Sequence, residues 1–245
     1  MTGATPLLET TALTRRFGGV IAVHGVDFQV TDGELRCLIG PNGAGKSTFF
    51  RCLAGQIRPT AGRIRLAGHD ITGDGPHAIA RRGVAIKTQV PALFDGLSVA
   101  ENVRLATWRC GDRAARQRKT EEVLATIGLA RQAARPAGEL PHGQRQWLEL
   151  GLVIAGDPRL LLLDEPTAGM TRREVAETAE LVRGLAAERT IIAVEHDIQF
   201  IRMVADTVTV FHQGRVLTEG TVDTVLQDRA VRDVYLGHRR NAVAC

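Results

Sequence analysis

Short runs of apolar and β-branched residues dominate the first ninety positions of the chain. Short runs of this kind, bounded by glycine, proline and charged side chains, are typical of strands rather than helices. The amino-terminal part is therefore predicted to be rich in β-structure. The expected strands cover residues 7–14, 26–30, 35–39, 63–66 and 84–87.

Between residues 93 and 156 the apolar positions take on the spacing of helices. Ser98 and Glu101 stand three residues apart, which is the spacing of a capping box and marks the start of a helix. The region is therefore predicted to be a helical subdomain set into the β-rich core. The expected helices cover residues 98–109, 112–127 and 144–155.

Beyond residue 156 strands and helices alternate, as in a parallel sheet covered by helices. We expect strands over 160–163 and 190–195, helices over 171–188 and 197–205, and a hairpin that pairs 207–211 with 215–218. The pattern predicts the α/β class and a single domain. Its expected parts are a core of residues 7–92 and 157–237, a helical subdomain of residues 93–156, and tails at 1–6 and 238–245.

With 245 residues, 44% of them hydrophobic and 24% charged, the composition is that of a soluble globular protein. No apolar run is long enough to cross a bilayer, and no export signal is visible, so we expect the protein to work in the cytosol. The four scattered cysteines are expected to be free thiols, and the seven histidines show no metal-ligand spacing. A net charge of +4 could favour nucleic acid or an anionic membrane surface, but a solvated basic surface fits it better.

A glycine-rich pattern follows the expected strand 35–39 and leads into a helix. Such a loop brings many backbone N–H groups close to a triphosphate, so ATP or GTP is the first ligand to consider. Lys46 can reach the outer phosphates, and the Ser47 hydroxyl can complete the coordination shell of Mg²⁺. The alternative is a glycine-rich turn, but the complete pattern in this context favours a nucleotide. The residues are Gly40, Pro41, Asn42, Gly43, Ala44, Gly45, Lys46, Ser47 and Thr48.

Two acidic residues, Asp164 and Glu165, follow the fully apolar strand 160–163. The carboxyl ends of parallel strands are where ligands of open α/β sheets bind. Asp164 is placed to orient Mg²⁺ or its bound water, and Glu165 to accept a proton from the attacking water. Acidic residues also begin many ordinary loops, but the phosphate loop makes the catalytic interpretation the better one.

Two polar residues follow other expected strands. Gln89 comes after strand 84–87 and could reach the metal or the attacking water with its amide. His196 comes after strand 190–195 and could donate a hydrogen bond to the γ-phosphate. Each is weak evidence alone, because a polar loop residue or a lone histidine is usually structural. Their order along the chain gives them weight.

This order of motifs resembles the ATP-binding cassette (ABC) ATPases over about residues 7–237. The resemblance implies a P-loop NTPase core with a parallel sheet, an amino-terminal antiparallel β-subdomain, an inserted helical subdomain, and ATP and Mg²⁺ as ligands. It implies a head-to-tail dimer in which each ATP lies between the phosphate loop of one cassette and the signature loop of the other. Glu165 would be the general base, His196 the γ-phosphate contact and Gln89 the link between nucleotide and helical subdomain. Residues 168–170 would form the cross-dimer loop, and Phe17 would stack on adenine or fill the core.

The signature departs from the family pattern. The usual Leu-Ser-Gly-Gly-Gln is replaced by Leu140 followed by Pro141, His142, Gly143 and Gln144. Proline removes a hydroxyl and one backbone N–H that would face the partner's γ-phosphate. We therefore expect this signature to serve a weakened composite site. The site built on the chain's own Lys46, Glu165 and His196 stays competent if a partner supplies a good signature.

Finer resemblance points to the cassettes of branched-chain amino-acid importers, on residues 16–19, 89–103, 194–197 and 234–237. Residues 142–149 and 168–171 are similar to the urea and short-chain amide branch. The implied partners are two membrane permeases, a second non-identical cassette and an extracytoplasmic solute-binding protein. The chain would then act at the cytoplasmic face of the membrane.

Three other functions fit the sequence less well. A cassette ATPase acting on nucleic acid or ribosomes usually carries a coiled-coil insertion or a second cassette, and neither is present. A small-molecule kinase does not need the run 163–166 together with Gly143 and Gln144. Intact Glu165 and His196 speak against a regulator that binds nucleotide without hydrolysis.

Overall fold

The computed structural model describes residues 6–88 and 93–234. The strands in these ranges are β1 (Leu8–Phe17), β2 (Val20–Val30), β3 (Leu35–Ile39), β4 (Ala61–Leu66), β5 (His69–Asp70), β6 (Val84–Lys87), β7 (Leu160–Asp164), β8 (Thr190–Val194), β9 (Thr207–His212) and β10 (Arg215–Gly220). The α-helices are α1 (Lys46–Leu53), α2 (Pro76–Arg81), α3 (Val99–Ala106), α4 (Arg113–Thr126), α5 (His142–Ile154), α6 (Arg172–Ala186), α7 (Ile198–Val204) and α8 (Val222–Gln227). Two short 3-10 helices, Ala130–Gln132 and Ala137–Glu139, precede α5.

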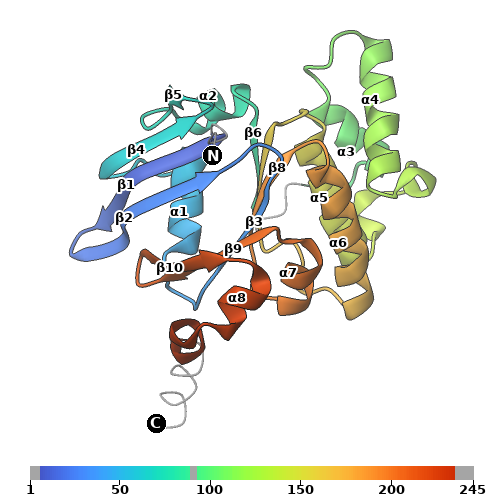
Figure 1. Cartoon of the computed structure of the whole chain (residues 1–245). Coiled ribbons are helices and arrows are strands. Elements are labelled where there is room, and N and C mark those ends of the chain that lie inside the picture. The colour runs from blue at the N-terminus through green and yellow to red at the C-terminus, as the bar shows by residue number, and fades with distance from the viewer. Residues whose placement is uncertain (1–5, 89–92, 235–245) are drawn as a thin grey trace.

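An antiparallel sheet with the order β2-β1-β4-β5 lies at the amino-terminal end of the molecule (Figure 1). It confirms the predicted antiparallel β-subdomain. The first two strands are longer than predicted, because β1 runs on to Phe17 and β2 already begins at Val20. The positions added to β1 are partly or fully exposed, whereas those added to β2 include the apolar run Val20 to Val23, in which Val23 is buried.

A second sheet has the order β10-β9-β3-β8-β7-β6 and forms the centre of the molecule. Its strands from β9 to β6 are parallel, and β10 pairs with β9 in an antiparallel hairpin, as predicted. Strand β7 is buried on both faces. Leu161 and Leu163 pack into one apolar cluster, whereas Leu160 and Leu162 pack into the other. A strand covered on both faces reads as a continuous apolar run.

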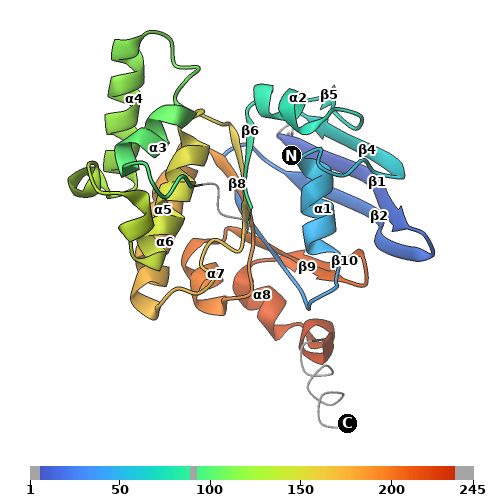
Figure 2. The same cartoon turned by 180° about the vertical axis from the view of Figure 1, so that it is seen from behind.

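The two faces of the central sheet are covered by different layers (Figures 1 and 2). On one side α1 and the antiparallel sheet share a cluster in which the ring of Phe49 contacts those of Phe28 and Phe211. On the other side α5, α6 and α7 pack on the sheet, with α3 and α4 further out. The carboxyl ends of the parallel strands are left between these layers. This arrangement confirms the predicted α/β class with an inserted helical subdomain.

Helix boundaries follow local signals. Ser98 and Glu101 form the predicted capping box at the start of α3, and Thr171 and Glu174 form a second one at α6. Helix α5 begins two residues earlier than predicted because Pro141, with φ −55°, occupies its N-cap. The prediction for α3 was too long, since the helix ends at Ala106. The short helix α2 was missed.

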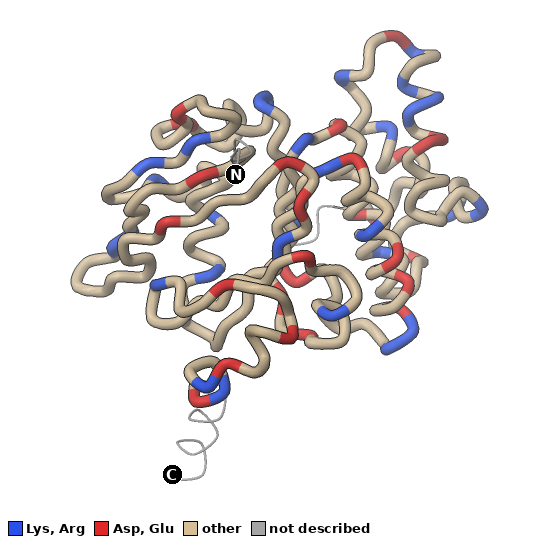
Figure 3. The backbone as a smooth tube through the Cα atoms, viewed as in Figure 1, with Lys and Arg blue, Asp and Glu red and all other residues tan. Residues whose placement is uncertain are grey.

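Acidic and basic residues are interspersed over the described part of the chain (Figure 3). No helix in that part is long and apolar enough to span a bilayer. Three of the four cysteines lie there, Cys37, Cys52 and Cys110, and all three are free thiols as predicted.

Candidate nucleotide site

Three glycines of the loop between β3 and α1 have a positive φ that other residues avoid, and two of them, Gly40 and Gly45, are also closely packed. Gly40 has φ 145° and Gly45 has φ 101°. A Cβ at either position would also overlap a backbone oxygen, that of Phe211 beside Gly40 and that of Ala22 beside Gly45. The first turn of α1 carries no capping side chain, so its amides are available to an anion. The loop is therefore built for the close approach of a phosphate chain.

Lys46 connects this loop to the acidic residues after β7. Its Nζ donates hydrogen bonds to the carbonyl oxygens of Gly40, at 2.6 Å, and Pro41, at 3.1 Å. Burial lowers the pKa of the ammonium group, while the carboxylates of Glu165 and Asp164 act in the opposite direction. The loop follows β3 and the acidic pair stands at the end of β7, and both strands pair in parallel with β8, so the loop and the acidic pair lie at one edge of the sheet.

Asp164 ends β7 with a carboxylate that lacks a full set of partners. Burial raises the pKa of this group, and the charge of Glu165 raises it further, against nearby basic side chains that include Lys87. Its Oδ1 is buried and has no hydrogen-bond partner. An unpaired buried carboxylate oxygen is unfavourable, and a hard divalent cation would satisfy it. Asp164 and the hydroxyl of Ser47, in the first turn of α1, therefore fit Mg²⁺.

Glu165 and His196 come together from two neighbouring strands, β7 and β8. The distance from Glu165 Oε1 to His196 Nδ1 is 3.9 Å. The amide of Glu165 donates to the carbonyl of Val194, and its φ of 48° lies in the left-handed region that non-glycine residues avoid. Such a conformation persists only where neighbouring structure holds it, and it is enriched at functional sites. The pair lies at the carboxyl edge of the sheet, open enough to meet a ligand.

Glu195, which the sequence predicts at the end of a strand, also belongs to this site. Its side chain is fully buried, and each carboxylate oxygen accepts two hydrogen bonds. Oε1 accepts from the amide and hydroxyl of Thr167, and Oε2 from the amides of His196 and Asp197. Glu195 thus joins the loop that begins with Glu165 to the loop that holds His196. The one signal in sequence was a carboxylate at the end of an apolar strand.

The signature residues lie on the opposite face of the sheet from α1. His142 Nε2 is 3.0 Å from the carbonyl oxygen of Ala168, so the signature contacts the chain's own residues 168–170. Gly143 is buried against the carboxylate of Glu174, and the Oε1 of Gln144 is buried without a partner. Among the residues described, no hydrogen bond or ion pair joins residues 141–144 to the phosphate loop. The structure therefore brings the signature residues to residues 168–170 and not to Lys46.

Two further residues were predicted to belong to the site, Phe17 and Gln89. Phe17 ends β1 with 44% of its surface exposed and with the guanidinium of Arg15 4.4 Å from its ring centroid. This exposure argues against a role in filling the core. Gln89 lies outside the described residues, directly after the segment that contains β6.

Comparison with known proteins agrees with this geometry. The family model described as "ABC transporter" matches residues 23–168. The chain belongs to the ABC transporter family. Its fold is that of the ATP-binding cassette, the ATPase unit of these transporters. A solved cassette of an ABC transporter in its ADP conformation superimposes with a TM-score of 0.87 at 26% identity, covering 96% of this chain and 100% of that one.

Curated relatives are similar over nearly the full length of this cassette. The high-affinity branched-chain amino acid transport ATP-binding protein BraF of Pseudomonas aeruginosa is 36% identical, covering 95% of this chain and 98% of that protein. LivG of Escherichia coli, with the same description, is 34% identical with the same coverage. A sulfate/thiosulfate import ATP-binding protein of Chromobacterium violaceum is 35% identical over 96% of this chain and 64% of that protein. ATP-binding subunits of ABC importers work with membrane permease subunits.

Proposed function

We propose that this cassette energises a membrane importer of branched-chain amino acids or of urea and short-chain amides. The observation that carries the proposal is the convergence of Lys46, Asp164, Glu165 and His196 at one edge of the central sheet. Full-length similarity to ATP-binding proteins named for branched-chain amino acid transport supports the solute class. The urea and amide branch rests on the sequence resemblance of residues 142–149 and 168–171.

ATP would bind along the phosphate loop and the amino terminus of α1. Backbone amides of residues 40–48 would surround the phosphates, and the Lys46 ammonium would leave its carbonyl partners to meet the β- and γ-phosphates. The exposed ring of Phe17 is available to stack on adenine. Ser47 and Asp164 would hold Mg²⁺, with Gln89 as a further ligand. Bound Mg²⁺ would neutralise charge on the phosphate oxygens.

Hydrolysis needs a base and a group that recognises the γ-phosphate. Glu165 would accept the proton of the water that attacks the γ-phosphorus, as the bond to the bridging oxygen breaks and ADP leaves. His196, 3.9 Å from that carboxylate, would donate a hydrogen bond to the γ-phosphate. Glu195 would hold the loop after Glu165 and the loop of His196 in place through its hydrogen bonds.

The separation of the signature from the phosphate loop supports a head-to-tail pair of cassettes. Residues 141–144 lie with residues 168–170 on the far side of the sheet from α1, where a second chain could meet them. The second cassette is proposed to be non-identical, because Pro141 leaves this signature without a capping hydroxyl. We also propose the division into a core of residues 7–92 and 157–237 and a helical subdomain of residues 93–156.

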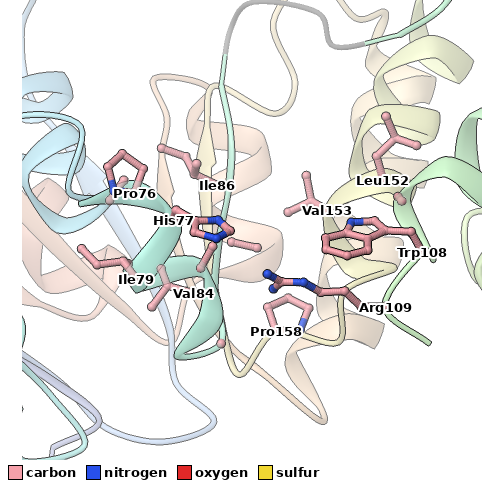
Figure 4. A pocket seen from close by; sticks show the side chains of 16 residues that line it. Pro76, His77, Ile79, Val84, Ile86, Trp108, Arg109, Leu152, Val153 and Pro158 are labelled. Atoms are coloured by element: carbon pink, nitrogen blue, oxygen red, sulfur yellow. The ribbon is translucent and has the colours of Figure 1, made fainter. Parts of the chain in front are cut away.

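A groove of about 500 Å³ lies beside β6, between α2 on one side and the ends of α3 and α5 on the other (Figure 4). Its walls are mostly apolar, with Ile79, Ile86 and Val153 inside and Trp108 and Arg109 at one side. The groove is lined by the first residues of β6, so a permease element seated here would act on the nucleotide site through that strand, which leads along the chain toward Gln89. We place the permease contact at this groove and the chain at the cytoplasmic face of the membrane, with an extracytoplasmic solute-binding protein as an indirect partner.

The test uses the assembled transporter in proteoliposomes, with ATPase and solute uptake measured together. Glu165→Gln keeps the shape of the side chain but removes the base, so ATPase should fall by about 100-fold or more while ATP binding persists. Normal turnover by this variant would count against Glu165 as the base. Uptake of labelled leucine, urea and acetamide separates the two solute classes. If ATPase activity is intact but none of these solutes is taken up, the transporter imports another polar solute. If ATPase activity does not depend on the permease, the cassette is not engaged in transport.

A further inference from the structure

Helix α6 faces the central sheet with a stripe of buried residues that contains one hydroxyl. Val175, Ala179, Val182 and Leu185 are apolar, whereas Thr178, in the same stripe, is only 2% exposed. A buried hydroxyl is unfavourable unless it is hydrogen-bonded, so its partners show what the position is used for.

The Thr178 hydroxyl joins two other elements. Its Oγ1 accepts a hydrogen bond from Trp147 Nε1 at 2.8 Å and donates one to Met170 Sδ at 3.2 Å. Threonines inside helices ordinarily donate to the carbonyl four residues earlier, as Thr120 and Thr126 do in α4. In Thr178 the hydroxyl bridges between elements instead.

The two partners stand on the segments that carry the signature and the cross-dimer loop. Trp147 lies on α5, about one turn after the signature residues 141–144, and Met170 is the last residue of the loop 168–170. The same two segments also meet through His142 Nε2 and the carbonyl of Ala168. Several contacts along α5 therefore hold this helix in one orientation against α6 and the loop.

A third contact strengthens the junction at the first turn of α5. Gly143 is packed so closely on the Glu174 carboxylate that a Cβ would overlap it. Hydrogen bonds from Thr171, with a smaller contribution from the amide of Gly143, lower the pKa of Glu174. The start of α5 is thus tied to the start of α6, and Thr178 ties the next turn.

We propose that Thr178 is a positioning residue for the ATPase reaction. Its hydroxyl sets the orientation of α5 relative to residues 168–170, and with it the direction in which the first-turn amides of α5 point toward the nucleotide of a second cassette. The inference rests on the proposed function in one respect, since it takes the head-to-tail pair as the active form. The bond between Trp147 and Thr178 can be tested without that assumption.

The first experiment measures ATPase against ATP concentration in the assembled transporter. Thr178→Val removes the hydroxyl at nearly the same volume, and Thr178→Ser is the matched control that keeps it. We expect KM for ATP to rise about fivefold in Thr178→Val, the size expected for one lost neutral hydrogen bond, with a smaller change in kcat. Thr178→Ser should stay within about twofold of the wild type. An unchanged KM in Thr178→Val, or equal losses in both variants, would overturn the inference.

The second experiment reads the bond in the isolated chain by fluorescence. The chain has two tryptophans, and Trp108 is 60% exposed, so Trp108→Phe leaves Trp147 as the single emitter. In this background Thr178→Val should shift the emission of Trp147 and Thr178→Ser should not. No shift in either variant would overturn the inference. An absence of permease-dependent ATPase in the wild type would instead overturn the proposed function, whatever the fluorescence shows.

Discussion

Lys87 and Glu149 form an ion pair with 3.2 Å between Nζ and Oε2, and both side chains are almost completely buried. Lys87 ends β6, the strand that leads toward Gln89, and Glu149 lies in the middle of α5. The pair therefore links the edge of the central sheet to the helix that carries the signature. Lys87 is also close enough to Asp164 to act on its carboxyl.

Removing one member of this pair should destabilise the protein strongly. Lys87→Met or Glu149→Leu leaves an unpaired buried charge, so each should lower the free energy of unfolding by about 3–5 kcal/mol. The double variant should recover most of that loss, because burial of two apolar side chains needs no charge partner. Urea denaturation monitored by circular dichroism measures all three.

An exposed pair supplies the control for this prediction. Arg173 and Glu177 are 88% and 37% exposed, and water screens their attraction. Arg173→Ala should change the free energy of unfolding by less than about 1 kcal/mol. If Lys87→Met and Glu149→Leu change the free energy of unfolding as little as Arg173→Ala does, the buried ion pair does not stabilise the fold.

Glu195 should be needed for turnover more than for ATP binding. Glu195→Gln turns an acceptor oxygen into an N–H donor that faces two other donors. The hydrogen bonds that join the loop after Glu165 to the loop of His196 are therefore weakened. We expect kcat to fall about tenfold, with the Kd for ATP within about threefold of the wild type. Glu188→Gln, at an exposed position, serves as the control. A Glu195→Gln variant with normal kcat would show that the carboxylate of Glu195 is not required for turnover.

The signature proline offers a gain-of-function test. Pro141→Ser restores a hydroxyl and an N–H at the N-cap of α5, so the composite site that uses this signature should work better. ATPase of the assembled transporter is expected to rise about twofold or more. Pro59→Ser, in the loop before β4, is the matched control. If activity is the same before and after Pro141→Ser, the idea of a weakened site loses its support.

Acid should remove a stabilising contribution from Glu34. Burial by itself raises the pKa of this carboxyl, but hydrogen bonds from Arg36 and Thr31 outweigh it, so the pKa lies below its ordinary value of 4.5. A lowered pKa means that ionised Glu34 stabilises the fold above pH 4.5, and that this contribution is lost as the pH falls through the folded-state pKa. Glu34→Gln should cost about 1 kcal/mol at pH 7 and almost nothing in acid. A cost that does not vary with pH would contradict the assignment.

Local signals account for the parts of the structure that were predicted. The capping boxes at Ser98 and Thr171 each involve residues three positions apart, so the chain encodes them without help from the fold. The apolar strand β7 and the alternating pattern after it predicted the parallel sheet in the same way. Short elements were the failures: α2 has six residues and β5 has two, too few for a period to show.

The sequence by itself determined the α/β class and the nucleotide loop, because strand periodicity and the glycine-rich pattern are local properties. It also placed Asp164, Glu165 and His196 at strand ends. Only the tertiary structure decided which buried polar groups support them: Glu195 beneath the site, Lys87 against Glu149, and Thr178 between Trp147 and Met170. Most of these bonds join residues that are far apart in the chain. A buried polar side chain is stable only with a hydrogen-bond or ion-pair partner, and folding alone brings that partner near.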